Sequence, residues 1–510
     1  MEAVSNFFGR VRKKEVIARI DRFINSKYML AVFALLSLLS NIFRLEILVY
    51  CITFCVALYT VLFGKDMLII AAVVFFMYIS PSDTNNPFIH TDSFFFPGNG
   101  AALWLIVAFI LLFLVAVCVR IATDGGFVAF LGHKRALLPG FLLLFAAFLL
   151  GGSGYEKYDW RNITYSLLLI ASFFLPYFFL TACVRWKEVP KDYFAWLGLI
   201  AGFTVVFELV NVFVIHADNI FSDGAILRHY IYTGWGTYTS MSVVMLICMP
   251  CAFYLAAVKK HGFIFNILGN LIYCAIVLSN GRGSILMGAV VYVLCAVAVL
   301  RRRNNRRANA VVYAVVLIGA AVAVGILHDH VRQLFAFILD PNLGDSNRFA
   351  LFKDGLQRFF NLPLFGQGFY ACPPDFWNNA GGATFLPAFW HNTFIQMLAA
   401  CGIAGLAAYL FHRFQTLLLF FRKPGFAKTF MGFSVLGILL TCLLDCHLFN
   451  IGVGLIYSVI LAFAEKSGEM EREAEDDLAA SFFRRHQKKC VVPAAYIAAE
   501  GEKGNGGDAA

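Results

Sequence analysis

Arginine and histidine residues mark three short polar segments that border long apolar runs. Arg282 lies in the turn SNGRGS, Arg348 begins the segment RFALFKDGLQRFFN, and His391 shortly precedes the apolar run TFIQMLAACGIAGLAAYL. Guanidinium groups keep their charge at any relevant pH and bind phosphate through paired N–H donors. A neutral imidazole can take a proton from an attacking hydroxyl group. Together these side chains would suit a reaction in which a sugar leaves a lipid-carried diphosphate and joins an acceptor hydroxyl.

Two more arginines could take part, Arg228 as a further phosphate-binding residue and Arg358 as a supporting residue. Arg228 lies in the polar stretch 217–237, and Arg358 follows Arg348 on the same segment. A simpler interpretation stays open for each arginine. Arg228 would then be an ordinary loop residue, and Arg282 and Arg358 would contact lipid headgroups at the membrane surface.

Two acids and one amide could support the histidine. Glu208 lies inside an apolar run and Asp445 at the border of another, where an unpaired charge is costly. Asn392 directly follows His391. The alternatives are structural, because the acids could pair with arginines away from any reaction and His391 could be an interfacial polar residue.

The composition is that of a membrane protein. Of 510 residues, 60% are hydrophobic and only 14% are charged, whereas soluble proteins have about 25% charged residues. Apolar runs of about twenty residues recur, and each can cross a bilayer core of about 30 Å. The sequence therefore predicts an all-α, polytopic integral membrane protein with about 12–14 transmembrane helices and one large extracytoplasmic loop.

The predicted spans follow one another along most of the chain. They are 28–43, 45–63, 67–80, 101–119, 136–152, 162–184, 193–216, 238–258, 263–279, 284–300, 309–327, 391–412, 430–446 and 448–464. The first three are short or closely joined, which leaves the exact number of spans open.

The charges of the loops predict the orientation. Basic clusters follow even-numbered spans, at 120–135, 185–187, 259–260, 301–307 and 413–428. These loops and both termini are therefore predicted to lie in the cytoplasm, and the intervening loops are predicted to lie outside. The net charge of +10 does not indicate a nucleic-acid-binding protein, because the basic residues occupy short loops on one side.

Five regions are predicted from this pattern. They are a basic cytoplasmic arm (1–27), an N-terminal bundle of transmembrane helices (28–327), a large extracytoplasmic loop (328–390), C-terminal transmembrane helices (391–464) and a largely disordered cytoplasmic tail (465–510). The predicted outer loops contain no Asp-x-Asp pair, and the cysteines lack the spacing of a zinc site, so we expect neither a metal nor another cofactor. The paired carboxylates of a glycoside hydrolase are also missing from the pattern.

The segment that begins at Arg348 is predicted to form an amphipathic helix on the outer membrane surface. Residues 345–347 can cap its start, and the sequence Asn361-Leu362-Pro363 ends it. Four residues recur at helical spacing and predict its apolar face: Phe349, Phe352, Leu356 and Phe359. Gly366 and Gly368 then predict a flexible turn.

These segments together resemble the O-antigen ligase and polymerase superfamily. The resemblance rests on SNGRGS, on NRFALFKDGLQRFFNLPLFGQGF and on HNTFIQMLAACGIAGL, and it covers roughly residues 225–464. Members of this superfamily show an Arg flanked by small residues at the start of a span. An Arg-led amphipathic helix with a Pro and a Gly-x-Gly turn comes next, and then a His-Asn pair followed by Gly-Ile-x-Gly.

The resemblance implies an enzyme of the bacterial cytoplasmic membrane that transfers a glycan from undecaprenyl diphosphate. A ligase passes the glycan to a lipid or protein acceptor and a polymerase extends it, without a metal and with inversion at the anomeric centre. His391 would correspond to the base, and Arg282, Arg348 and Arg228 to the residues that bind the diphosphate. The chain lacks the family's Pro-Asn after Arg228 and reads GWGTYTSM there, so the match of Arg228 is weaker than that of Arg282.

Two other classes of protein remain open. A transporter or flippase for a lipid-linked glycan would show repeated halves, broken spans and charges near the middle of the membrane. A non-catalytic partner in a polymer-assembling complex would tolerate the loss of His391 and Arg282. The grouping of charges at the predicted outer border favours the enzyme.

Overall fold

The computed structural model describes most of the apolar part of the chain. The described residues are 2–43, 45–76, 100–123, 132, 135–156, 158, 160–218, 221–222, 225–226, 231–233, 236–303, 305–326, 328, 348–369 and 389–489. Most of the predicted loops 81–100 and 328–390, and the last 21 residues (490–510), lie outside this part.

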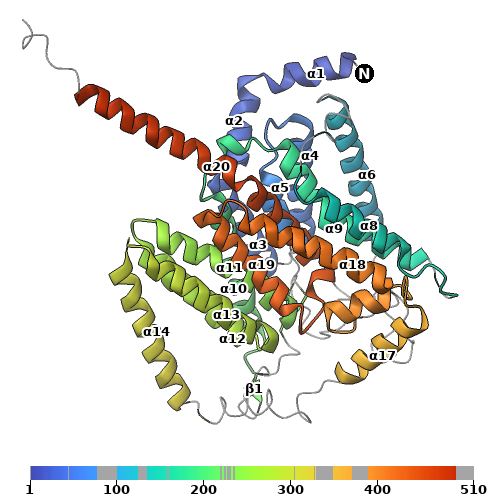
Figure 1. Cartoon of the computed structure of the whole chain (residues 1–510). Coiled ribbons are helices and arrows are strands. Elements are labelled where there is room, and N and C mark those ends of the chain that lie inside the picture. The colour runs from blue at the N-terminus through green and yellow to red at the C-terminus, as the bar shows by residue number, and fades with distance from the viewer. Residues whose placement is uncertain are drawn as a thin grey trace, which may run out of the picture.

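The N-terminal half consists of helices in the predicted places (Figure 1). Their bounds are α1 Glu2–Arg12, α2 Glu15–Ile24, α3 Lys27–Phe43, α4 Glu46–Phe63, α5 Ile69–Phe76, α6 Gly100–Thr123, α8 Leu138–Leu150, α9 Trp160–Cys183, the 3-10 helix η1 Trp186–Glu188, and α10 Tyr193–Ile215. Two small antiparallel hairpins follow in the described part. Strand β1 (Phe221–Ser222) pairs with β2 (Ala225–Ile226), and β3 (Tyr232–Thr233) pairs with β4 (Gly236–Thr237).

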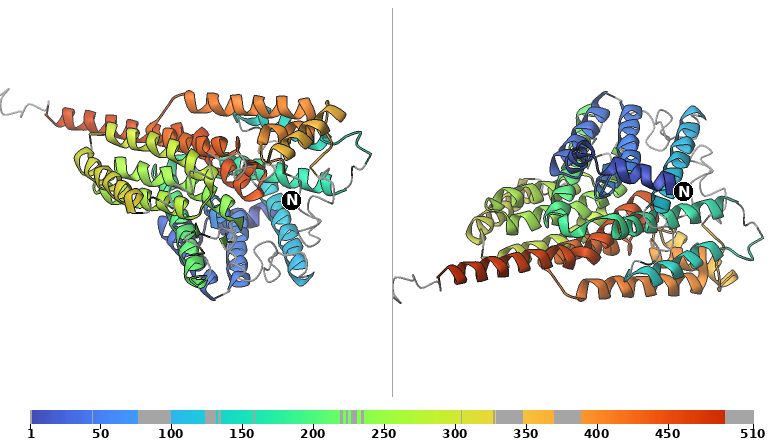
Figure 2. Two further views of the ribbon diagram at one scale, coloured as in Figure 1. Left: turned by 90° about the horizontal axis from the view of Figure 1, so that it is seen from below. Right: turned by 90° about the horizontal axis from the view of Figure 1, so that it is seen from above.

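The C-terminal half continues with helices. They are α11 Tyr238–Val258, α12 Gly262–Leu278, α13 Arg282–Arg301, α14 Arg306–Ile326, α17 Arg348–Asn361, α18 Thr393–Phe421, α19 Phe426–Thr441, the 3-10 helix η4 His447–Phe449, and α20 Ile451–Lys489. Helix α20 extends from the helical body on the side away from α17, as Figures 1 and 2 both show.

The predicted fold class is confirmed, because the described chain is helical and polytopic. By length and composition, seven described helices could cross a membrane: α9, α10, α11, α13, α14, α18 and α20. The pair α2 and α3, bent by 61°, would make an eighth. Shorter apolar helices coincide with further predicted spans, namely α4, α6, α8, α12 and α19.

Helix α11 lies at the centre of the bundle. It packs against α10, α12, α13 and α19, and every residue from Met241 to Ala257 is buried. This helix carries no charged residue, so it can be surrounded by protein on all sides without an unpaired charge. Helices α13 and α19 reach from this core to the end that carries His391.

The predicted span 391–412 ends too early. Helix α18 continues to Phe421 and not to 412, so Arg413 belongs to the helix and not to a loop. The polar side chains of this last part find partners inside the bundle. Arg413 donates a hydrogen bond to the hydroxyl of Tyr457, and the side-chain oxygen of Gln415 accepts one from the Gly140 amide. The basic connection is therefore 422–425, and Pro424 lies within it.

Candidate active site

One end of the bundle, here called the site end, holds the start of α13, the start of α18 and the connection 442–450 between α19 and α20. The Thr393 amide donates to the Cys442 carbonyl at 3.1 Å, and the Asn392 side chain donates to the Leu443 carbonyl at 2.9 Å. A β-carbon at Gly283, next to Arg282, would lie 3.5 Å from the Leu444 side chain. These contacts bring three segments that are distant in sequence together at one place.

His391 and Asp445 form a pair at the site end. The distance from His391 Nδ1 to Asp445 Oδ1 is 2.9 Å, and His447 Nε2 lies 3.7 Å from the other oxygen, Oδ2. The Cys446 amide also donates to Asp445 Oδ1, at 2.7 Å. With Asp445 at Nδ1, the imidazole of His391 keeps Nε2 for other partners, and 33% of its side chain is exposed.

The carboxyl of Asp445 is held in its ionised form. Burial alone would raise its pKa, but the nearby His447, the hydrogen bond from His391 and the Cys446 amide together hold the pKa well below its ordinary value. A carboxylate at Nδ1 fixes the tautomer of a histidine and stabilises the imidazolium that forms when Nε2 takes a proton. The pair therefore has the arrangement of a general base and its orienting acid.

His447 is the third member of this cluster and is nearly buried. Burial lowers its pKa, the charge of Asp445 raises it, and the charges of His391 and Arg348 lower it further, so that the net change is downward. The influence of Arg348 places the start of α17 near the site end. His447 was not predicted as a site residue, although Asp445-Cys446-His447 at the border of two apolar runs was a usable signal.

Asn392 fixes the start of α18 directly after the histidine. Its side-chain oxygen accepts hydrogen bonds from the Phe394 and Ile395 amides at 2.9 and 3.2 Å. These amides would otherwise lack partners at the start of a helix. His391 itself has a positive φ of 48°, which is uncommon for a residue other than glycine. The cap and the contacts to 442–446 hold this strained residue in place.

Arg282 is the first residue of α13 at the site end. The turn before it is tight, since Asn280 has a φ of 57° and a β-carbon at Gly281 would lie 2.4 Å from the Ser242 hydroxyl. Gly281 therefore allows close packing against α11. The result is that Arg282 starts its helix next to the segment that carries Asp445.

A break in α18 lies at Gly402, which has φ 65° and ψ −162°. The segment 363–368 fills this break. The Gln367 and Gly368 amides donate to the Ala399 and Ala400 carbonyls at 2.8 and 2.9 Å. In return, the Ile403 and Ala404 amides donate to the Pro363 and Leu364 carbonyls at 2.9 and 3.3 Å. The backbone groups that a broken helix leaves without partners are thus satisfied by the turn after α17.

Helix α17 has the predicted bounds, and the face that packs against the protein is not the predicted apolar face. The face against α18 is formed by Leu351, Gly355 and Arg358, whereas Phe349 is 69% exposed. Gly355 decides this packing, because a β-carbon there would lie 2.5 Å from Ile395 and 2.9 Å from Trp390. Because glycine has no side chain, α17 can approach Ile395 and Trp390 closely on this face, although the opposite face is more apolar.

Arg358 is buried and paired, not a surface cation. Its Nε donates to Asp354 Oδ2 at 2.8 Å, and its Nη1 donates to Gln367 Oε1 at 3.2 Å. The same Asp354 oxygen accepts a hydrogen bond from Trp390 Nε1 at 2.8 Å. Trp390 directly precedes His391, so Arg358 and Asp354 position the residue beside the candidate base.

Two predicted site residues remain, Arg228 and Glu208. Arg228 lies outside the described residues. Glu208 is buried within α10, at 2% exposure. The sequence also did not predict the polar side chains that contact Trp390 and Cys446. One of them is Gln396, whose side-chain oxygen accepts from the Trp390 amide at 3.1 Å.

Comparison with known proteins agrees with the sequence motifs. A search of curated proteins found no significant match to this chain. Residues 267–410 match the family model described as O-antigen ligase. The matched segment begins within α12 and ends within α18, and it contains Arg282, Arg348 and His391. Asp445 and His447 lie beyond it. The resemblance predicted from the sequence is confirmed over this segment, which relates the chain to the O-antigen ligase-like superfamily.

Proposed function

We propose that the protein is a glycosyltransferase that moves a glycan from undecaprenyl diphosphate to a hydroxyl group of an acceptor. The acceptor would be a lipid or another glycan, and the reaction would take place at the outer face of the bacterial cytoplasmic membrane. The observation that supports this most is the pair His391 and Asp445 at 2.9 Å, at the end of the bundle where α13 begins with Arg282. The family relation of residues 267–410 supports the same class of reaction.

In the proposed reaction, His391 Nε2 takes the proton of the acceptor hydroxyl. The hydroxyl oxygen forms a bond to the anomeric carbon, and the bond from that carbon to the diphosphate oxygen breaks. The electron pair leaves with undecaprenyl diphosphate, and attack from the opposite face inverts the anomeric centre. Arg282 and Arg348 stabilise the departing charge, a role that a metal ion has in other transferases. Asp445 stabilises the imidazolium.

A transporter of lipid-linked glycans is the alternative class. Broken transmembrane helices often line transport sites, and α18 is broken at Gly402. Here the segment 363–368 occupies the break and satisfies its backbone groups. This packing favours a structural role for the break, and the enzyme remains the proposal.

The test is glycan transfer in a strain that lacks this gene. The strain is complemented at matched expression by the wild type, His391→Ala, Arg282→Ala, or the controls His261→Ala and Arg307→Ala. The controls alter exposed residues elsewhere, His261 directly before α12 and Arg307 in the first turn of α14. We expect both site variants to lose the surface glycan while the lipid-linked precursor accumulates at the outer leaflet, and both controls to retain it.

The form of the glycan in the null strain separates the alternatives. Long unattached chains would identify a ligase, and single repeat units would identify a polymerase. Normal product from both site variants would contradict the assigned site, and precursor retained at the inner leaflet would favour the transporter.

A further inference from the structure

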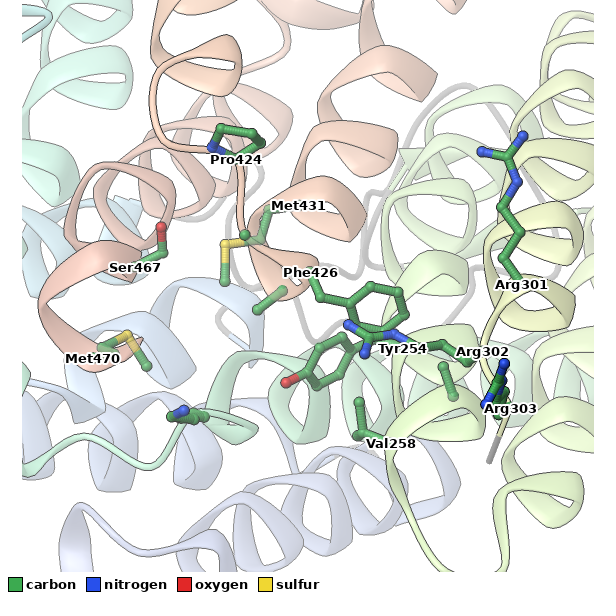
Figure 3. Close-up of a pocket in the computed structure, with 14 residues that line it drawn as sticks. Tyr254, Val258, Arg301, Arg302, Arg303, Pro424, Phe426, Met431, Ser467 and Met470 are labelled. Atoms are coloured by element: carbon green, nitrogen blue, oxygen red, sulfur yellow. The ribbon is translucent and has the colours of Figure 1, made fainter. Parts of the chain in front are cut away.

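A large basic pocket lies at the end of the bundle opposite the site end. Its volume is about 910 Å³, and it lies between the C-terminal ends of α11 and α13, the start of α19 and the part of α20 near Met470 (Figure 3). Helix α13 connects the two ends, since its 20 residues begin with Arg282 and end with Arg301. A helix of this length rises about 30 Å, which is the thickness of a bilayer core.

The pocket has a cationic side and an apolar side. In Figure 3 the three arginines lie on one side, Met431 and Met470 lie on the other, and Tyr254 lies between them. The cationic lining residues are Arg301, Arg302, Arg303 and Lys191. No carboxylate is present among the lining residues, and none in the described part of the chain pairs with these four cations.

The carboxylate next to Lys191 in the sequence forms ion pairs elsewhere. Asp192 follows Lys191 directly, but its oxygens accept hydrogen bonds from Lys27 and Lys259, the former at 2.7 Å. Asp192 therefore does not neutralise the pocket. Several positive charges around one cavity repel one another, and an anion in the cavity would relieve this repulsion.

Arg302 is oriented to bind such an anion. Its guanidinium carbon lies 3.9 Å from the centroid of the Phe426 ring. A stacked guanidinium uses its face for the aromatic ring and keeps the N–H donors at its edge, which match the oxygens of a phosphate. The stacking reduces the freedom that the side chain would lose on binding.

We infer that this pocket binds the phosphate headgroup of an anionic membrane lipid. The cations would hold the phosphate, and the apolar side with Tyr254 and Met431 would contact the start of the lipid tails. A free phosphate would use only the cationic side. The combination of both sides, at the end of membrane-length helices, favours the lipid. This site is independent of the proposed reaction at His391 and lies at the end predicted to face the cytoplasm.

The experiment measures lipid binding to the full chain. Purified protein is titrated with phosphatidylglycerol, with zwitterionic phosphatidylethanolamine and with inorganic phosphate, and bound lipid is counted by native mass spectrometry. Three forms are compared: the wild type, the triple variant R301Q/R302Q/R303Q, and the control R306Q/R307Q. The control removes two exposed arginines that follow in the sequence but do not line the pocket.

We expect phosphatidylglycerol to bind the wild type and the control alike, and to bind the triple variant about tenfold or more weakly. Equal binding of phosphatidylglycerol by the triple variant would overturn the inference. Binding of inorganic phosphate with the affinity of the lipid would overturn the lipid assignment and leave a simple anion site.

A second variant guards against misfolding of the triple variant. Phe426→Leu keeps all four cations and an apolar side chain but removes the ring under Arg302. We expect weaker binding of phosphatidylglycerol with an unchanged melting temperature in detergent. Full binding by this variant would contradict the role given to the stacked guanidinium.

Discussion

His391 and Asp445 meet at 2.9 Å although 54 residues separate them in the sequence. The imidazole belongs to the start of α18, and the carboxylate belongs to the connection between α19 and α20. The pair forms because Thr393 and Asn392 donate hydrogen bonds to backbone carbonyls of that connection. The same contacts that begin α18 therefore orient the candidate base.

The substitution Asp445→Asn should lower turnover strongly. An amide at this position neither fixes the tautomer of His391 nor stabilises its imidazolium, and the loss of oriented general-base catalysis costs about 100-fold or more. Because the proposed diphosphate contacts are unaffected, the KM for the donor should change little. Initial rates with lipid-linked glycan and purified protein give both constants. Glu188→Gln, which alters an exposed carboxylate, is the control. If Asp445→Asn turns over near the wild-type rate, Asp445 has no role in the mechanism.

The break at Gly402 predicts an unusual sensitivity to alanine. Its backbone conformation is nearly exclusive to glycine and would cost a residue with a side chain about 1–3 kcal/mol. In addition, a β-carbon there would lie 2.4 Å from the Leu364 backbone. We expect Gly402→Ala to lower the melting temperature in detergent by several degrees.

Gly319→Ala is the matched control for that substitution. Gly319 lies in α14, and a β-carbon there would meet nothing within 4 Å. Alanine is favoured over glycine within a helix by about 0.5–1 kcal/mol. This variant should therefore be as stable as the wild type or slightly more stable. If Gly402→Ala has the same melting temperature as the control, the backbone at the break accommodates a side chain and the prediction fails.

The sequence predicted the helices well because each depends on local composition. An apolar run of sufficient length forms a helix wherever it lies, and Arg348 and Asn361 bound α17 as predicted. The pairing of side chains depends on packing between distant segments. Arg358 was expected at the surface, yet Gly355 brings its helix against Trp390 and buries it. Asp445 was predicted as a possible support for His391 because of its costly position, but the local sequence did not establish that the two side chains would meet.

The pair Asp354 and Arg358 should be more sensitive to the loss of one member than of both. Asp354→Ala leaves the nearly buried Arg358 charge without its carboxylate and removes the acceptor of Trp390 Nε1, at an expected cost of roughly 1–3 kcal/mol. Adding Arg358→Met should restore part of this stability, because the uncompensated charge is then absent.

Measurements of kcat distinguish a role of Asp354 and Arg358 in positioning Trp390 from a role in stability alone. Asp354→Ala should lower kcat through the displaced Trp390 while the KM for the donor is retained. The double variant should regain part of its melting temperature but not its kcat. Full recovery of kcat would show that the pair contributes only to folding.

His447 should make the protein less stable in mild acid. Burial and the charges of His391 and Arg348 lower its pKa in the folded chain in spite of Asp445, so the folded state favours the neutral ring. The unfolded chain binds a proton at the ordinary value of about 6.5. The stability that comes from the neutral ring is therefore complete above about pH 6.5 and is lost progressively as the pH falls from there to the folded pKa. Protonation of Asp445 also lowers the stability of the folded chain, but only below its ordinary pKa of about 3.9, since its folded pKa is lowered too.

The wild type should thus melt at a lower temperature at about pH 5 than at about pH 7.5, and His447→Gln should reduce this difference. His261→Gln, which alters an exposed ring, should leave it unchanged. An identical pH dependence in His447→Gln and the wild type would show that another group causes the acid effect.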